Sequence, residues 1–347
     1  MIAQIVDESG DGLEQSRDYV AGARVYSDWI NAQGGIGGHR LVLVTRVDGG
    51  DAAGARDALR EVLDRNNAVA LFGFVSELAL AALASERELA RRGIALVAPL
   101  SGLDAAEGDE HTFFLRPSWG DEALFCIDWL RKTSLTRMAI VADASATSRA
   151  QREAALRGLA PRGVTLAADV AIGANGADAG AAARRVAAVQ PQFVLVLADS
   201  VGTAQFVRAW RAIDAGTPLV AMSRVRQQTV LELAGTRAAH GTLLTQVVPD
   251  PFKGTSPLAR QHLELMKRFR DEPPSHLTFE GFIAAKYLVT VMKSIGGRID
   301  RASVLAALRS RRTVDLAGMV IAWPERGSRG SRFADMTLLR RDGSLLQ

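Results

Sequence analysis

Serine and acidic side chains recur in this sequence directly after short apolar runs, where they could bind a small ligand. Ser76 and Glu77 follow one such run, and Ser101 and Gly102 follow the next. A serine that opens a helix satisfies a free backbone amide, and the same helix start attracts a carboxylate. Ser76 is therefore predicted as a helix N-cap, as a contact to a ligand carboxylate, or as both.

Four further candidates follow other apolar runs. They are Ser9, Ser145, Asp199 and Ser223. Serine and aspartate also form turns and helix caps by bonding to nearby backbone groups, and glycine permits the reversal at Ser101-Gly102. Each position is therefore predicted either as local turn chemistry or as a ligand contact.

Patterns typical of enzymes and metal sites are missing from the sequence. It contains no G-x-S-x-G elbow and no Walker A lysine, and its five histidines show no H-x-x-x-H spacing. Carboxylates after strands could support acid–base chemistry, but almost any α/β protein carries them. We therefore predict no catalytic residue, no metal and no cofactor, although an enzyme on the same scaffold remains a rival that would need a catalytic group.

The elements that must position these residues alternate along the chain. Short apolar runs separated by helical patterns indicate βαβ units and parallel sheets. In such sheets ligands bind beyond the carboxyl ends of the strands. The predicted strands are 2–6, 41–45, 68–72, 94–97, 138–142, 165–171, 193–198, 218–222 and 242–247. The predicted helices include 52–63, 78–91, 121–132, 149–159, 179–189, 201–213, 258–269 and 277–295.

Composition and charge narrow the class of protein. The 347 residues are 48% hydrophobic and 23% charged, which is typical of a globular protein of two domains. The net charge is +4, but the arginines are scattered and no nucleic-acid motif accompanies them. No segment approaches the roughly 20 apolar residues of a membrane span. Cys126 lies in an apolar helical stretch, so it is predicted to be a small core residue. We expect no nucleic-acid partner and no membrane insertion.

A glycine-rich segment, from Trp29 to Arg40, follows a predicted helix and precedes a predicted strand. Gly34 suits the left-handed residue that ends a helix. A phosphate-binding loop needs the opposite order, so the segment is not a nucleotide fingerprint. It resembles the signature of the type I periplasmic binding proteins, the family of the leucine/isoleucine/valine-binding protein that feeds ABC importers.

Five other segments resemble that family in the same order along the chain. They are 47–48, 71–76, 97–102, 248–251 and 279–286. The resemblance implies an α/β fold with two doubly wound parallel-sheet lobes, joined by a hinge of three crossings. It implies that lobe I comprises residues 1–117 plus 249–322, and that lobe II comprises 118–248 plus 323–347. Residues 171–183, rich in alanine and glycine, are predicted as a mobile loop.

The resemblance also implies how a ligand is held. The family's serine at the position of Ser76 binds a ligand carboxylate, and the turn at Ser101-Gly102 donates to the same group. Amino-acid-binding members carry an acid near Ser223 for the ammonium group. A serine stands there in this chain, so a carboxylate without an amine is expected, with Asp199 as the nearest substitute acid.

The function implied is extracytoplasmic capture of a small carboxylate-bearing ligand, an amino acid or an aromatic or aliphatic acid, for an ABC transporter permease. A periplasmic location is expected, with the signal peptide removed, because Met1 already opens the first predicted strand. The alternative is a cytosolic ligand-sensing regulator of the same fold.

Overall fold

The computed structural model describes residues 1–9, 11–64, 67–103, 110–323 and 329–346, and the chain divides into two compact units. Unit 1 comprises Met1–Arg116 and Val248–Phe333. Unit 2 comprises Pro117–Val247 and Ala334–Gln347. The chain therefore passes from one unit to the other three times.

The third passage lies later in the chain than the sequence indicated. It was expected at Trp323-Pro324, of which Pro324 is outside the described residues, and unit 1 instead continues to Phe333. The Trp323 ring packs edge-on against Phe113 at 5.7 Å, and its Nε1 donates to the Tyr287 hydroxyl at 3.2 Å. These contacts belong to the core of unit 1, so the indole keeps this segment there.

Unit 1 is built on a five-stranded parallel sheet in the order β2-β1-β3-β4-β5. Its strands are β1 (Ile2–Val6), β2 (Leu43–Val47), β3 (Ala70–Phe72), β4 (Leu96–Val97) and β5 (Thr112–Phe113), and a separate pair is formed by β11 (Val314–Asp315) and β12 (Val320–Ile321). Its helices are α1 (Asp11–Ala32), α2 (Ala52–Asp64), α3 (Glu77–Ser85), α4 (Glu88–Arg92), α11 (Pro257–Phe269), α12 (His276–Lys293) and α13 (Arg301–Arg309).

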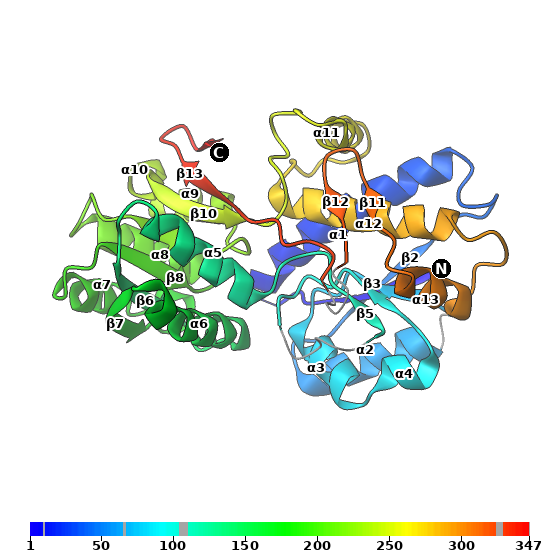
Figure 1. Cartoon of the computed structure of the whole chain (residues 1–347), viewed down its shortest axis with the longest axis horizontal. Helices are drawn as coiled ribbons and strands as arrows, with labels where there is room; N and C mark the ends of the chain where they lie inside the picture. Colours follow the sequence, from blue (N-terminus) through cyan, green and yellow to red (C-terminus); the bar gives the residue numbers. More distant parts are fainter. Residues whose placement is uncertain (10, 65–66, 104–109, 324–328, 347) are drawn as a thin grey trace. The chain divides into compact units, whose positions relative to one another are not determined.

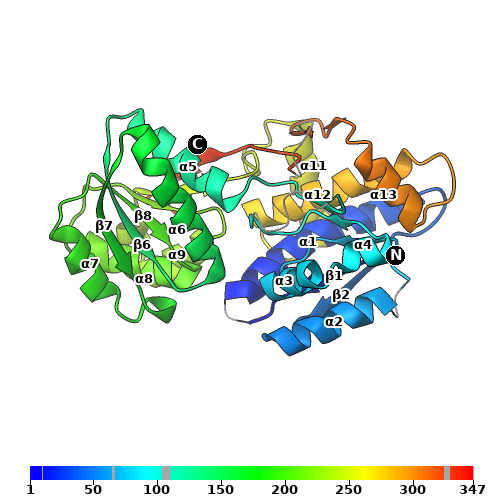
Figure 2. The same ribbon diagram turned by 60° about the horizontal axis from the view of Figure 1, so that its bottom comes forward.

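Helices cover both faces of this sheet, as a parallel sheet requires. Along β1, Ile2 and Val6 belong to the core beneath α1 and α12, whereas Ala3 and Ile5 belong to the core beneath α2 and α3. Figure 2 shows β1 and β2 between α1 and α2. The alternation along β1 therefore assigns its side chains to two separate apolar layers.

The predicted helix 78–91 is two helices, α3 and α4. Arg87 interrupts it with left-handed backbone (φ 50°, ψ 33°). Leu83 of α3 and Leu89 of α4 are both buried in the same apolar cluster. Apolar residues on both sides of Arg87 face the same core, so the sequence pattern does not show that the helix is interrupted there.

Unit 2 is built on a seven-stranded sheet in the order β14-β13-β10-β9-β8-β6-β7. Its strands are β6 (Arg137–Ala142), β7 (Thr165–Ala171), β8 (Phe193–Leu197), β9 (Leu219–Ala221), β10 (Thr242–Gln246), β13 (Asp335–Leu339) and β14 (Leu345–Leu346). Its helices are α5 (Trp119–Arg131), α6 (Ala146–Leu159), α7 (Ala179–Ala187), α8 (Ser200–Arg211), α9 (Gln227–Ala234) and α10 (Thr236–Ala239), with 3₁₀ turns at Ala160–Arg162 and Ala174–Gly176.

The five strands β6 to β10 are parallel, and β13 and β14 extend the sheet as an antiparallel pair. One apolar cluster joins this sheet to α5 and α6 and buries Cys126, while another joins it to α7 and α8 (Figure 1). The expectation of a mobile loop over 171–183 is wrong in part, because α7 begins at Ala179 and buries Ala182 and Ala183. The predicted α/β fold with two doubly wound sheets is confirmed.

Helices α1 and α12 pack with their backbones in close approach (Figure 1). A Cβ atom on Gly22 of α1 would lie 1.8 Å from the Thr278 carbonyl oxygen. A Cβ atom on Gly281 of α12 would lie 2.0 Å from the Tyr19 carbonyl oxygen. No side chain fits at either position, so the two glycines allow this helix contact.

We expect Gly281→Ala to lower the free energy of unfolding by about 3 kcal/mol, because the added methyl group forces the two helices apart. Gly180→Ala in α7 is the matched control, since its new Cβ would meet only Arg184 Nη1 at 3.7 Å. The control should be neutral or stabilising by up to about 1 kcal/mol. Urea denaturation of both variants measures the difference, and equal effects would contradict the proposed contact.

Two histidines are buried beside α12 in unit 1. His262 Nε2 lies 3.0 Å from Thr278 Oγ1, and the His262 ring packs against Phe279 and Phe282. Burial, with a smaller contribution from His276, lowers the pKa of His262 to about 3. Burial lowers the pKa of His276 to about 4. Both side chains are therefore neutral in the native state at neutral pH.

These lowered pKa values predict a loss of stability in mild acid. Below pH 6.5 the unfolded chain takes up protons at these histidines and the native state does not, so stability falls from pH 6.5 toward pH 3–4. For His262 the loss between pH 7 and pH 5 is about 2 kcal/mol. His262→Gln should reduce that pH-dependent difference by this amount in urea titrations at both pH values. An unchanged difference would show that His262 does not cause it.

Candidate functional site

Ser76 lies at the carboxyl edge of the unit 1 sheet, the edge at which the parallel strands end, and it is the N-cap of α3. Its Oγ accepts a hydrogen bond from Ala79 N at 2.9 Å. Its hydroxyl donates to Asp48 Oδ2 at 2.6 Å. Asp48 is buried after β2, and its Oδ1 accepts from Gly50 N at 2.9 Å. Because a hydroxyl has a single proton to donate, that proton is committed to Asp48 in this structure.

Ser101 lies after β4 and contacts the residue that follows Ser76. Its hydroxyl donates to Glu77 Oε2 at 3.1 Å, and its Oγ accepts from Leu103 N at 3.2 Å. Ser101 and Gly102 are buried, and Glu77 is partly exposed. The structure therefore brings four predicted site residues together at the ends of β3 and β4, held by bonds within the protein.

Ser9 lies in the loop after β1. Its backbone N–H and its hydroxyl both donate to Asp7 Oδ1, at 2.7 and 2.5 Å, which is local turn chemistry. Asp7 N donates to Val75 O at 3.1 Å and joins this loop to the end of β3. Gly10, the next residue of the predicted turn, is outside the described residues.

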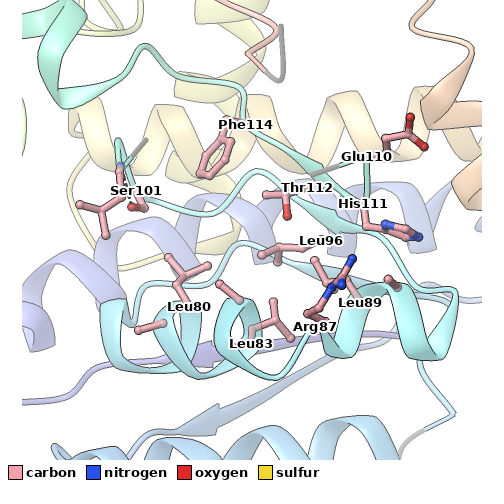
Figure 3. A pocket seen from close by; sticks show the side chains of 14 residues that line it. Leu80, Leu83, Arg87, Leu89, Leu96, Ser101, Glu110, His111, Thr112 and Phe114 are labelled. Carbon is pink, nitrogen blue, oxygen red and sulfur yellow. Dashed lines mark hydrogen bonds between the residues drawn. The ribbon is translucent and has the colours of Figure 1, made fainter. Parts of the chain in front are cut away.

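A cavity of about 430 Å³ lies within unit 1 against α3, α4 and the last two strands of the sheet. Ser101 is at one end, and Glu110 and His111 are at the other (Figure 3). The wall between them is mostly apolar and includes Leu80, Leu83, Leu89, Leu96 and Phe114. The cavity could accommodate an aliphatic group next to Ser101.

In unit 2, Asp143 joins the ends of β6 and β8. Its Oδ1 accepts from Ser145 N at 2.8 Å, and its Oδ2 accepts from Asp199 N at 3.0 Å. Ser145 is the N-cap of α6, and Asp199 is the N-cap of α8, where its Oδ1 accepts from Gly202 N at 2.5 Å. The Asp199 carboxylate is thus engaged in capping, which is the alternative role that its sequence context indicated.

Ser223, after β9, contacts an acid that its sequence neighbourhood does not reveal. Its N–H donates to Glu122 Oε1 at 2.6 Å, and its hydroxyl donates to Glu122 Oε2 at 3.0 Å. The Thr245 hydroxyl also donates to Glu122 Oε1. Glu122 is fully buried at 0% exposure. The sequence analysis named Asp199 as the nearest substitute acid and did not identify Glu122, whose carboxylate ties the loop after β9 to β10.

Arg224 extends from the same loop along the carboxyl edge of unit 2. Its guanidinium carbon lies 5.3 Å from the centre of the Trp119 ring, and its Nη1 donates to Thr147 Oγ1 at 2.7 Å. Trp119 is buried in the first turn of α5, so the guanidinium rests on a fixed aromatic surface. The sequence analysis missed this residue, although its position three residues past the end of a strand was a usable signal.

Both sets of predicted residues thus lie at the carboxyl edges of their own sheets, and their roles toward a ligand remain predictions. The strand order supports these positions. In unit 1 the order 2-1-3-4-5 reverses direction between β1 and β3, and in unit 2 the same order reverses between β6 and β8. In open α/β sheets such reversal points are where ligands bind.

The fold is that of a protein built from two doubly wound units within one chain. Residues 1–342 match the family described as periplasmic binding protein, and the chain belongs to that family. Among curated proteins none matches the chain.

Several solved structures are similar over the whole length. A substrate-binding periplasmic protein from Ralstonia solanacearum is 28% identical, with TM-score 0.91 and coverage of 100% of this chain and 99% of that one. An extracellular ligand-binding receptor from Verminephrobacter eiseniae is 21% identical, with TM-score 0.92 and the same coverage. A branched chain amino acid ABC transporter structure from Thermus thermophilus with bound valine is 15% identical, with TM-score 0.86 and coverage of 100% and 94%.

Two further observations concern the described residues alone. None of their helices combines the length and apolarity needed to cross a membrane. None of their histidine, cysteine and acidic side chains gather in groups of three or more that could hold a metal ion.

The two roles of Ser76 predict a large effect on stability. Ser76→Ala removes an N-cap, worth about 1 kcal/mol, and removes a donor from the buried Asp48 carboxylate, worth about 1–3 kcal/mol. We expect unfolding to become easier by about 3 kcal/mol in urea titrations. Ser145→Ala, which removes an exposed N-cap beside no buried carboxylate, should cost only about 1 kcal/mol. Equal losses in the two variants would rule out the Asp48 contribution.

Proposed function

We propose that this chain is an extracytoplasmic solute-binding protein that captures a small carboxylate-bearing molecule and delivers it to the permease of an ABC importer. The ligand would be an amino acid or an aromatic or aliphatic acid. Membership of the periplasmic binding protein family supports a binding role. Several similar structures are described as substrate-binding proteins of ABC transporters, which supports the transporter as partner.

The observation that carries the proposal is where the polar side chains gather. Each sheet concentrates serines and carboxylates at the carboxyl edge, next to the point where the strand order reverses. Leu13 and Leu78, in the first turns of α1 and α3, are 49% and 40% exposed. Such leucines would suit the carbon skeleton of an organic acid or an apolar amino acid.

The proposed mechanism is closure of the two units on the ligand. Three chain passages connect the units, and a few residues in such connections can serve as a hinge. A ligand that contacts residues of both units favours the closed state only by the contacts that it gains there. The closed form would then be the one that the permease recognises.

Thermal-shift measurements with amino acids and with aromatic and aliphatic acids would identify a ligand, because a compound that binds only the native state raises the melting temperature. Small-angle scattering with that ligand should then show a smaller radius of gyration than without it. A panel that gives no shift would remove the proposed ligand class. A ligand that binds without any change in radius would contradict closure.

A further inference from the structure

Two neighbouring strands of unit 1 lead into their turns through left-handed backbone. Gly73, directly after β3, has φ 58°, and Ala98, directly after β4, has φ 54°. Each of them lies three residues before a candidate site serine, Ser76 in the first turn and Ser101 in the second. The conformation of these two residues therefore sets the direction in which each turn leaves its strand.

Of these two residues, Ala98 is the strained one. A Cβ atom disfavours left-handed backbone, so glycine adopts it at little cost and alanine does not. The following residue is Pro99, which favours extended backbone at Ala98. Ala98 is nevertheless buried, and its N–H donates to the Phe113 carbonyl oxygen at 2.8 Å. A backbone of this kind persists only where surrounding contacts enforce it.

Tyr19 of α1 supplies such a contact and touches both turns. Its hydroxyl donates to the Ala98 carbonyl oxygen at 2.7 Å. Its ring lies against Gly73, where an added Cβ atom would be 2.7 Å from Tyr19 Cε1. Burial raises the pKa of the Tyr19 phenol well above its ordinary value, so the hydroxyl keeps the proton that it donates.

The backbone of Tyr19 is itself held in place. Its carbonyl oxygen lies at the close contact between α1 and α12, where glycine at position 281 leaves no room for movement. The two turns are also bonded to each other, because Leu100 N donates to the Phe74 carbonyl oxygen at 2.8 Å. Tyr19 therefore connects a fixed helix contact to a pair of joined turns at the carboxyl edge of the sheet.

We propose that Tyr19 is a positioning residue of the ligand site: its hydroxyl holds Ala98 in the left-handed conformation and so fixes where Ser101 and Gly102 lie before a ligand binds. The inference rests on the proposed solute-binding function, and all the contacts that support it lie within unit 1. A turn that is already ordered lowers the cost of ordering it on binding. Loss of the hydroxyl should therefore weaken binding.

Hydrogen exchange of the ligand-free protein tests the turn directly. In Tyr19→Phe we expect the amides of Leu100 and Leu103 to exchange about two- to tenfold faster, the range for one lost hydrogen bond. Adding Ala98→Gly to this variant should restore their protection, because glycine adopts the left-handed backbone without help from the hydroxyl.

Tyr26→Phe is the matched control. Tyr26 lies about two turns further along α1, and its ring packs against Trp29 and Phe282. It loses the same atom from the same helix, and exchange of Leu100 and Leu103 should stay at the wild-type rate. Ligand-free melting curves of each variant test whether it remains folded.

Calorimetric titrations with leucine, 4-methylpentanoate and benzoate test the consequence for binding. A probe that binds the wild-type protein should bind Tyr19→Phe about two- to tenfold more weakly. The double variant Tyr19→Phe/Ala98→Gly should regain the wild-type affinity, and Tyr26→Phe should keep it. A residue that only stabilises unit 1 would not give this recovery of affinity through a change at position 98.

The possible outcomes separate the two proposals. Faster exchange and weaker binding in Tyr19→Phe, both reversed by Ala98→Gly, support the positioning role. Unchanged exchange, or faster exchange that Ala98→Gly does not reverse, overturns it. A probe that binds Tyr19→Phe as tightly as wild type also overturns it and leaves the solute-binding function standing. If no probe binds the wild-type protein, the proposed ligand class fails, and the exchange rates decide whether Tyr19 holds the turn.

Discussion

The close contact between α1 and α12 is the constraint on which unit 1 depends. The two helices belong to segments separated by more than two hundred residues, yet their backbones meet at Gly22 and Gly281. This contact lies in the segment that returns the chain to unit 1 after Pro117–Val247, the larger part of unit 2. Without it, the face of the sheet that carries Ile2 and Val6 would lose its cover. Glycine is therefore required at position 281, because the Cβ atom of any larger residue would collide with the Tyr19 carbonyl oxygen.

The carboxyl edges are ordered mainly by bonds that the protein makes with itself. Ser76 donates to Asp48, Ser101 donates to Glu77, and Ser223 donates to Glu122. Buried carboxylates are tolerated because each one accepts hydrogen bonds from neighbouring groups. Side chains whose donors are already engaged act by shaping the edge.

Much of the fold could be predicted from the sequence because parallel strands are short apolar runs with clear limits. The strands Ile2–Val6 and Thr165–Ala171 coincide with their predicted ranges. The short strand Thr112–Phe113 and the break at Arg87 were missed. Neither feature produces a periodic pattern in the sequence, because contacts with other parts of the fold determine where the short strand and the helix break occur. The resemblance implied a third chain passage after residue 322, whereas unit 1 continues to Phe333, because the Trp323 ring is held by unit 1.

The residues of the candidate site also include some that the sequence predicted and one that it did not. Residues next to strand ends, such as Ser76 and Asp199, could be found from position alone, and their capping roles followed from residue type. Glu122 could not, since it lies 101 residues from Ser223 in the chain and in the first turn of a helix. Sequence position locates the edge of a sheet, but it does not reveal which distant side chain is folded against that edge.

Unit 1 is formed by two segments that are far apart in the chain, and this arrangement affects how the protein folds during synthesis. Domains generally fold as units as the chain emerges. The five parallel strands of unit 2 lie within the continuous stretch Pro117–Val247, so their sheet can assemble as soon as that stretch is made. The N-terminal strands must wait with one apolar face covered only in part, by α1, until α12 arrives from a much later part of the chain. The segment made first is therefore among the last to be buried, and it is the part of the nascent protein most in need of protection from aggregation.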